Sequence, residues 1–563
     1  MAASRRLRFA PGQPDAMITM ALPQSSTLAA RRDRLLLAGI ALLAFVLRVW
    51  RLDYQSLWRD EVDAVLFASR SLPDALAMFT RVGENGPLYF LGLNVWIDLA
   101  GQSELAIRFP SACCGVLAVL TTYHLGRVLL SRPIALIGAL LLAVSPYHIW
   151  YGQEAKMYAL ISFLAPLSLL IVIRAVRSEH RRLWLLWAAL MAAFLYVHLF
   201  AVMMLLVAVI WTPLLHSFRR PRLSPALVVA GIAIIAAGLP VARWLIPAAL
   251  TPVETGYYRY GLGEMIAILL RNFSMGLRPA GGPWPVLLFT LMLVLGCVPL
   301  VYQLRAQEVG GAWPPRRGVL LMLLYLVTPL LAIWLVSLRR PTFTDRYLII
   351  VLPAFFLMIA TGVVVAAQAI AAALGSERGA PQQAVVASLR RRRIAATRAG
   401  MHHDQAPTHA SASAAPAHAA DRRRCFAAAL TVLLVGVCMP FVWAQTHNPY
   451  KADFRAATQY LTTQSAPDDL VLFVMPYVQR GFAYYHPQAV RTAEPPFTRD
   501  MSAVQVDTAL RALVAGSKVV WLYLSEAEFW DERGQIAAWF ERNATQRCRQ
   551  EFAYIEVRCY EVR

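Results

Sequence analysis

Apolar runs long enough to cross a membrane dominate this sequence and constrain its fold more than any other feature. A helix needs about 20 mostly apolar residues to cross the hydrocarbon core of a bilayer. Eleven runs approach or exceed this length, at residues 35–50, 106–128, 134–150, 157–174, 183–197, 199–215, 225–248, 285–303, 318–338, 347–373 and 425–445. Because 58% of the residues are hydrophobic and only 15% are charged, the sequence predicts a polytopic α-helical membrane protein.

A further apolar run over residues 87–101 decides the predicted topology. It is short for a span and contains Asn94 and Asp98. If it crossed, the arginine-rich loops at 174–182 and 216–222 would lie outside, against the tendency of arginine to stay in the cytoplasm. If it lies along the membrane surface, both loops are cytoplasmic. We therefore predict eleven transmembrane helices and a juxtamembrane helix at 87–101.

This topology divides the chain into a membrane module and three polar segments. The arginine-rich stretches at 1–34 and 374–424 lack apolar periodicity and are predicted to be a disordered cytoplasmic tail and a disordered cytoplasmic linker. Residues 35–373 form the membrane module, and 425–445 is the last span. Residues 446–563 regain soluble character, which predicts a small extracytoplasmic α/β domain.

Within the predicted α/β domain, apolar runs indicate buried strands and amphipathic runs indicate helices. The strands are expected at 469–474 and 518–524, the helices at 451–464, 502–515 and 528–542, and a strand pair at 549–562. Cys548 and Cys559 are the two cysteines of this domain, and a disulfide between them is left open.

The net charge of +21 does not indicate nucleic-acid binding. The arginines cluster in short loops between apolar runs, as the positive-inside rule describes. The seven cysteines show no CxxC or Cys/His spacing typical of a zinc or redox site.

Three carboxylates stand in the first outer loop, directly after the first span. Asp60, Glu61 and Asp63 follow Trp58 and Arg59. Carboxylates repel one another and are costly beside apolar surroundings, so such a group often serves chemistry. The alternative interpretation is a solvated acidic loop.

Two later outer loops add an acid and several cations. One carries Glu154 and Lys156, and Lys156 is one of only three lysines in the chain. The other carries Arg339, Arg340 and Arg346, on the side where the topology rule disfavours positive charge. Such a loop favours an anionic ligand, and contact with phospholipid headgroups is the alternative.

Acids, cations and aromatic residues at one membrane surface fit the transfer of a sugar from a lipid-linked phosphate to a hydroxyl group. A carboxylate takes the acceptor proton, and cations balance the charge of the leaving phosphate. The candidate catalytic residues are Asp60, Glu61 and Glu154. The candidate donor-phosphate ligands are Lys156, Arg340, Arg346 and Tyr347. The candidate substrate-pocket residues are Trp58, Arg59, Glu84, Asn85, Tyr89, Gln153, Tyr158 and His198.

Five short motifs follow one another along the membrane module. They are Trp58-Arg59-Asp60-Glu61, Asn85-Gly86-Pro87-Leu88-Tyr89-Phe90, Arg108-Phe109-Pro110-Ser111, Gln153-Glu154-Ala155-Lys156-Met157-Tyr158, and Arg346-Tyr347-Leu348 with Pro353. In order and spacing they resemble the GT-C superfamily of membrane glycosyltransferases, on the branch that contains family 39. That branch includes protein O-mannosyltransferases, lipid A aminoarabinose transferases and lipopolysaccharide-core sugar transferases. The resemblance covers residues 35–365 and, more weakly, the external domain.

The resemblance implies roles for the motif residues. Asp60 takes the place of the catalytic base, with Glu61 beside it, and Glu154 that of the acid in the second loop. Lys156 stands where relatives often have arginine, and Arg346 with Tyr347 would contact the donor phosphate. The implied enzyme is an inverting sugar transferase of the bacterial cytoplasmic membrane that uses a polyprenyl-phosphate donor. Its acceptor is a lipid, a glycan or a protein on the outer face.

One motif departs from the family pattern. Relatives often have His-Pro-Pro where this chain has Asn85-Gly86-Pro87, preceded by Glu84. A metal or acceptor contact of that histidine is therefore not carried over. Some relatives use a divalent cation and others use none, so no cofactor is assigned and a divalent cation is left open.

Three other functions remain as alternatives. A transporter or lipid flippase would place charged residues near the middle of spans, whereas here they concentrate at the outer span ends. An O-antigen-ligase-type or polymerase enzyme would use a diphosphate-linked donor; the tandem Asp60-Glu61 favours, by resemblance, a monophosphate. A carbohydrate-binding assembly protein without activity would not need the acids. The sequence leaves the sugar and the acceptor unidentified.

Overall fold

The computed structural model describes residues 24–80, 86–178, 180–215, 225–250, 258–277, 281–301, 315–374 and 414–562. The predicted tail up to residue 23, most of the predicted linker (375–413) and the pocket candidates Glu84 and Asn85 lie outside the described residues.

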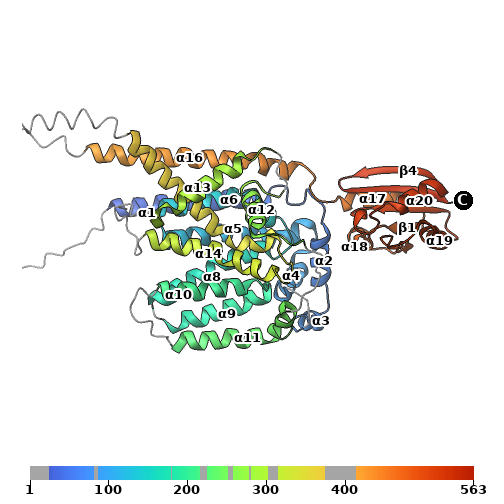
Figure 1. Ribbon diagram of the computed structural model, residues 1–563, viewed down its shortest axis with the longest axis horizontal. Coiled ribbons are helices and arrows are strands. Elements are labelled where there is room, and N and C mark those ends of the chain that lie inside the picture. Colours follow the sequence, from blue (N-terminus) through green and yellow to red (C-terminus); the bar gives the residue numbers. More distant parts are fainter. Residues whose placement is uncertain are drawn as a thin grey trace, which may run out of the picture.

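Helices occupy all eleven predicted spans and form one bundle (Figure 1). They are α1 Gln24–Val49, α5 Glu104–Leu129, α6 Arg132–Val144 with α7 Pro146–Gly152, α8 Tyr158–Ser178, α9 Arg181–Val197, α10 Ala201–Leu215, α11 Pro225–Leu250, α13 Trp284–Val301, α14 Pro315–Ser337, the span Asp345–Leu374 that opens with the 3-10 helix η1 Asp345–Val351, and α16 Ala414–His447. Within the described residues, seven helices are long and apolar enough to cross a membrane alone, and the bent pair α6–α7 makes an eighth. The multi-pass membrane fold is confirmed.

Two helices begin earlier than predicted. α1 starts at Gln24, ahead of the predicted span at residue 35, and α16 starts at Ala414, ahead of residue 425. Both extensions are rich in alanine and arginine, which are good helix formers. The polar composition that indicated a disordered tail and linker therefore does not end the helices at the predicted limits of the spans.

The 61° bend between α6 and α7 creates a buried position for Arg48, near the end of α1. Pro146 has no N–H group, so it leaves the carbonyl of Leu142 without its helical donor. Arg48 Nη2 donates to this carbonyl at 3.3 Å, and Nη1 donates to the carbonyl of Ala143 at 3.1 Å. Gly115 makes room, because a Cβ there would lie 2.6 Å from Arg48 Nε. The first span thus tolerates a buried arginine by pairing it with carbonyls at a helix end.

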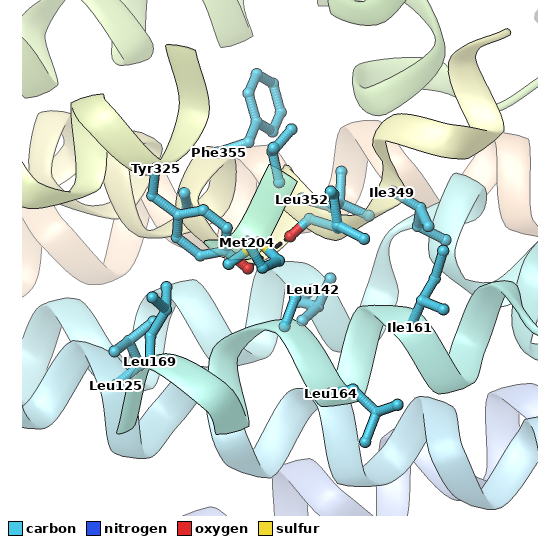
Figure 2. Packing of buried hydrophobic residues seen from close by; sticks show 14 of the residues in the cluster. Leu125, Leu142, Ile161, Leu164, Leu169, Met204, Tyr325, Ile349, Leu352 and Phe355 are labelled. Atoms are coloured by element: carbon cyan, nitrogen blue, oxygen red, sulfur yellow. Dashed lines mark hydrogen bonds between the residues drawn. The ribbon is translucent and has the colours of Figure 1, made fainter. Parts of the chain in front are cut away.

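The span Asp345–Leu374 lies at the centre of the bundle, because all residues from 348 to 363 are buried. Figure 2 shows part of this core, with Ile349, Leu352 and Phe355 contributed by this span. Gly362 lets α13 approach closely, since a Cβ there would lie 1.8 Å from the carbonyl oxygen of Met292. The beginning of the span, where the predicted phosphate ligands Arg346 and Tyr347 lie, packs against α8, α12 and α14.

Three short helices lie at the end of the bundle that faces the C-terminal domain (Figure 1). They are α2 Arg59–Ala68, α3 Leu72–Ala77 and α4 Pro87–Ala100, and α4 is the predicted juxtamembrane helix. Gly86, with a φ of 92°, and Pro87 set its start. The Asn94 side chain donates to the carbonyl of Ala68 at 2.6 Å. α4 therefore lies beside α2 instead of crossing the bundle. Another helix, α12 Leu262–Met275, packs against α7 and α13.

After α16 the chain forms a five-stranded sheet with helices on both faces. Its elements are α17 Phe454–Gln464, β1 Leu470–Phe473, the 3-10 helix η2 Pro476–Val478, α18 Gln479–Tyr485, β2 Thr492–Ala493, α19 Ala503–Val514, β3 Val519–Leu524, the 3-10 helix η3 Ala527–Phe529, α20 Gln535–Asn543, β4 Ala544–Phe552 and β5 Ile555–Val562. The strand order is β2-β1-β3-β5-β4; β1 runs parallel to β2 and β3, and β5 runs antiparallel to β3 and β4. Val471 and Trp521 join the core on one face, and Leu472 and Leu522 join the core on the other. The predicted α/β domain is present.

The elements of this domain agree with the sequence patterns, with the starts of α17, β4 and α20 shifted by three to seven residues. The predicted strands are β1 and β3, the predicted strand pair is β4 and β5, and the predicted helices are α17, α19 and α20. α20 begins at Gln535 instead of residue 528, because Asp531 accepts from the backbone amides of Gln535 at 2.9 Å and Ile536 at 2.7 Å. Cys548 and Cys559 form a disulfide between β4 and β5.

Polar contacts hold the α/β domain against the loop that follows the first span. Gln55 Oε1 accepts from the backbone amides of Tyr450 and Lys451 at 3.0 and 2.9 Å. The Ser56 hydroxyl donates to the carbonyl of Ala452 at 2.6 Å. These bonds hold the residues that follow the last span directly against the predicted catalytic loop.

Candidate active site

Glu61 lies at the centre of a fully buried ion cluster. Its Oε1 accepts from Arg108 Nε at 2.7 Å and from the Ala155 amide at 3.0 Å, and its Oε2 accepts from Arg108 Nη2 and Lys451 Nζ, both at 2.8 Å. Burial raises the pKa of Glu61, but Arg108 and Lys451 outweigh it and bring the pKa to about 2. With four donors on its two oxygens, Glu61 has little capacity left for a substrate. We infer that it joins three segments of the chain, in place of the predicted catalytic role.

Arg108 and Lys451 were absent from the predicted site residues. Arg108, on α5, also donates to the carbonyls of Leu52 and Gln55, each at 2.8 Å. Lys451 follows α16 and lies 3.7 Å from Glu154 Oε1. Each had a signal in the sequence, since Lys451 is one of three lysines and Arg108 belongs to one of the five motifs.

Asp60 precedes Glu61 in the first turn of α2 but points elsewhere, because successive helical residues are rotated by about 100°. Asp60 Oδ2 pairs with Arg346 Nη1 at 2.8 Å, and the two side chains are 24% and 23% exposed. Three aromatic rings lie around the guanidinium at 6.0, 5.7 and 5.9 Å, those of Trp58, Tyr158 and Tyr347. Five predicted residues from three distant segments thus meet. This group is called the Asp60–Arg346 cluster below.

Lys156 and His198 lie next to this cluster. Burial lowers the pKa of Lys156 below its ordinary value, and the nearby Asp60 offsets only part of this shift. Burial, with smaller effects of Arg346 and Lys156, lowers the pKa of His198 to about 3. His198 Nδ1 accepts from the amide of Phe200 at 3.2 Å. His198 is therefore an uncharged residue that lines the site, and the positive charge of the site comes from Arg346 and Lys156.

Glu154 lines a cavity of about 760 Å³ between the bundle and the α/β domain. The carboxylate is 0% exposed, and neither of its oxygens has a hydrogen-bond partner in the part of the chain that the structure describes. Burial raises the pKa of Glu154 to about 7, although Lys451 lowers it. A carboxyl group that exchanges its proton near neutral pH is suited to contact a substrate hydroxyl.

Glu154→Gln is expected to stabilise the protein more at pH 8 than at pH 5. Because the folded pKa of Glu154 lies above its ordinary value of 4.5, its contribution to stability is fully present below about pH 4.5 and is lost as the pH rises through about 7. Glutamine stays neutral throughout. Thermal unfolding of detergent-purified wild type and variant measures the effect, and a difference in Tm that is the same at both pH values would contradict it.

Two of the predicted pocket residues make contacts within the protein. Gln153 Nε2 donates to the carbonyls of Arg48 and Trp50 at 3.2 and 3.0 Å, so it closes the end of α1. The Arg59 guanidinium stacks 3.9 Å above the ring of Tyr477 in the α/β domain and lines the cavity.

Tyr89 and Arg340 are the remaining candidates. Tyr89 is partly buried on α4, and burial raises the pKa of its hydroxyl. Arg340 lies in the loop after α14 and is partly exposed, and its role as a phosphate ligand stays a prediction. Within the described residues, no group of three or more His, Cys, Asp or Glu side chains is arranged to hold a metal ion.

Comparisons with known proteins address the fold and the family. The model of the family described as dolichyl-phosphate-mannose-protein mannosyltransferase matches residues 84–244. None of the curated proteins matches the chain. Among solved structures, ArnT from Cupriavidus metallidurans bound to undecaprenyl phosphate is similar with a TM-score of 0.52 and 14% identity, over 93% of this chain and 97% of that one. The apo state of ArnT from Cupriavidus metallidurans gives a TM-score of 0.51 and 14% identity, over 94% and 98%.

At this level of identity, the likeness to solved structures establishes the fold. The comparisons confirm the resemblance that the motifs indicated, and they support the glycosyltransferase prediction and not the transporter or flippase alternative. The chain is a multi-pass membrane protein with the GT-C fold of membrane glycosyltransferases, followed by a small α/β domain.

Proposed function

We propose that this protein is a glycosyltransferase that moves a sugar from a polyprenyl-phosphate donor to a hydroxyl group. The observation that carries the proposal is the Asp60–Arg346 cluster, in which a carboxylate and a guanidinium share an aromatic enclosure beside Lys156. The donor class is supported by the similar ArnT structure, which contains undecaprenyl phosphate.

The transfer is a single displacement at the anomeric carbon of the sugar. Asp60 takes the proton of the acceptor hydroxyl, the acceptor oxygen bonds to the anomeric carbon, and the bond from that carbon to the phosphate oxygen breaks. The bonding electrons go to the phosphate, whose growing charge Arg346 and Lys156 stabilise. Attack from the face opposite the leaving phosphate inverts the anomeric configuration.

Asp60 and the donor phosphate compete for the same guanidinium. Without donor, Arg346 Nη1 holds Asp60 Oδ2 at 2.8 Å. A phosphate that takes over Arg346 frees the carboxylate of Asp60 to contact the acceptor hydroxyl. The base is thereby free to act only when a donor is present.

Arg346→Ala is expected to reduce donor use by about one to two orders of magnitude, because a charge-assisted contact to phosphate contributes about 1.5–3 kcal/mol. Arg346→Lys should recover part of the loss, because lysine keeps the positive charge but lacks the planar guanidinium that binds two phosphate oxygens at once. The measurement is turnover of detergent-purified variants at increasing concentrations of a lipid-phosphate sugar.

Arg271→Ala is the matched control, because Arg271 is an exposed arginine on α12, and it should behave as wild type. An Arg346→Ala enzyme with unchanged donor dependence would contradict phosphate binding by Arg346. Turnover with a diphosphate-linked donor and none with a monophosphate would favour the ligase-type alternative.

We further propose that the site and the α/β domain lie on the outer side of the bacterial cytoplasmic membrane. The distribution of arginine among the loops supports this orientation. In spheroplasts, a cysteine at Val504, which is 75% exposed on α19, should react with a membrane-impermeant thiol reagent. A cysteine at Ser178, exposed at the end of α8, should react only after lysis. The reverse pattern would place the site in the cytoplasm.

A further inference from the structure

The cavity between the bundle and the α/β domain has the size and lining of a ligand site. Its volume of about 760 Å³ lies within the usual range for ligand pockets, about 300–1,000 Å³. The bundle contributes Trp58, Trp150 and Glu154, and the α/β domain contributes residues 524–529 and 551–556, except 553. Two parts of the chain that are far apart in sequence therefore form one enclosure.

Several polar groups of the lining are buried without a hydrogen bond, although Glu154 Oε1 lies 3.7 Å from Lys451 Nζ. Within the described residues, both oxygens of Glu154, Nε1 of Trp58 and Oγ of Ser525 have no hydrogen bond. Glu154 is 0% and Ser525 is 4% exposed. Buried polar groups are nearly always paired, so these atoms indicate a ligand that both donates and accepts hydrogen bonds. Hydroxyl groups do both.

The backbone of the lining is strained at two positions. Glu526 and Tyr554 adopt left-handed backbone conformations, with φ values of 51° and 56°. Residues other than glycine rarely adopt this conformation. Both residues line the cavity, and the hydroxyl of Tyr477 bonds to the carboxylate of Glu526. Such strain persists where the surrounding structure holds it, often at ligand sites.

The lining is acidic. The five glutamates are Glu154, Glu526, Glu528, Glu551 and Glu556, against the cations Arg59 and Lys451. Lys451 pairs with Glu61 at 2.8 Å and lies 3.7 Å from Glu154, and Glu551 and Glu556 pair with Arg549. Glu526 and Glu528 are left against one cation, Arg59, which stacks on Tyr477 and keeps its charge, so the lining has an excess of negative charge. This lining disfavours an anion and favours hydroxyl or ammonium groups.

We infer that this cavity is the acceptor site and that it takes an uncharged or amine-bearing sugar of a glycan or glycolipid, not a phosphorylated sugar. The identity of the reaction rests on the proposed function, whereas the chemistry of the ligand rests on the cavity itself. Trp150 and Tyr450, whose ring centroids are 6.1 Å apart, and Tyr554 offer aromatic faces to a sugar ring. Glu154 is placed to accept from its hydroxyl groups.

The charge of the cavity is tested without turnover. Ser525→Cys places a thiol in the cavity of the full-length protein, and Val504→Cys places one on the exposed surface of the same domain. Both are modified with methanethiosulfonates that carry an ethylammonium or an ethylsulfonate group. We expect the ratio of the cationic to the anionic rate to be at least about tenfold higher for Ser525→Cys. An equal or lower ratio overturns the inference.

Two further variants assign the effect to the lining. Glu528→Gln, added to Ser525→Cys, should lower the rate ratio, because Glu528 lines the cavity. Glu532→Gln is the matched control, since the Glu532 side chain is 71% exposed and lies outside the lining, and it should leave the ratio unchanged. Equal effects of the two substitutions would overturn the assignment.

The acceptor is tested by transfer from a lipid-phosphate sugar to glycolipids extracted from cells that lack the gene. We expect transfer to persist after hydrofluoric acid has removed the phosphate groups of the glycolipids. We also expect Glu528→Arg to raise the KM for acceptor about tenfold without changing the KM for donor, and Glu532→Arg to behave as wild type. Loss of transfer after dephosphorylation, or sugar found only on protein, overturns the inference. A wild-type enzyme that transfers to no acceptor contradicts the proposed function instead, and the thiol rates still decide the chemistry of the cavity.

Discussion

Replacing Asp60 by asparagine is expected to reduce sugar transfer by about 10²–10⁴-fold, the usual contribution of a general base, while the protein stays folded. Asparagine keeps the size of the side chain and loses the group that accepts the proton. Asp60 is 24% exposed, and its ion pair is with Arg346 rather than with the buried cluster. The fold should therefore depend little on its charge. Turnover of purified variant with the same Tm as wild type measures the effect.

Asp63→Asn is the control for this experiment. Asp63 lies on the same helix and pairs with Arg480 at 2.9 Å, whose side chain is 59% exposed, so its loss should leave turnover near that of wild type. If Asp60→Asn also kept near-native turnover, Asp60 would not be the base. Glu154, with a pKa of about 7, would then be the next candidate.

Glu61→Leu is expected to destabilise the protein by about 3–5 kcal/mol, the usual cost of removing one partner of a buried ion cluster. The substitution would leave Arg108 and Lys451, whose side chains are 2% and 6% exposed, without their shared carboxylate. The loss should appear as a lower Tm in detergent, and the loss of activity should follow the loss of folded protein. A variant with wild-type Tm and no activity would return Glu61 to a catalytic role.

A triple variant separates the missing charge from the missing packing. Glu61→Leu with Arg108→Met and Lys451→Met replaces the cluster by apolar groups, which often restores the stability that a single substitution removes. We expect the triple variant to have a higher Tm than Glu61→Leu alone. An equal or lower Tm would mean that the bonds of Arg108 to Leu52 and Gln55, rather than the buried charge, dominate.

The sequence predicts the spans and the C-terminal domain well, because both depend on local patterns of apolar residues. The break between α6 and α7 was missed, although Pro146 lies inside the predicted span 134–150. The length of an apolar run does not show that a proline inside it lacks the N–H group needed for a helical hydrogen bond. The late start of α20 was not predicted either, because the N-terminal cap by Asp531 depends on side-chain geometry, which apolar periodicity does not show.

The site was predicted in part. Asp60 and Arg346 are 286 residues apart in the chain, and only the resemblance to a known fold suggested that they would meet. Asp60 and Glu61 are adjacent carboxylates, so the sequence alone does not distinguish their roles. The turn of α2 leaves the side chain of Asp60 partly exposed and buries that of Glu61. Lys451 lies beyond the last span, where the sequence gives no sign that the chain returns to the first loop.

We propose that the Asp60–Arg346 cluster transfers a sugar from a lipid-phosphate donor on the outer side of the membrane. The most direct test is mass spectrometry of envelope glycolipids, glycans and glycoproteins from cells that express wild type or Asp60→Asn at equal membrane levels. The cluster predicts that one sugar is missing from one class of acceptor in the variant, and that the matching polyprenyl-phosphate sugar accumulates. Identical acceptors and identical donor pools in the two strains would contradict it.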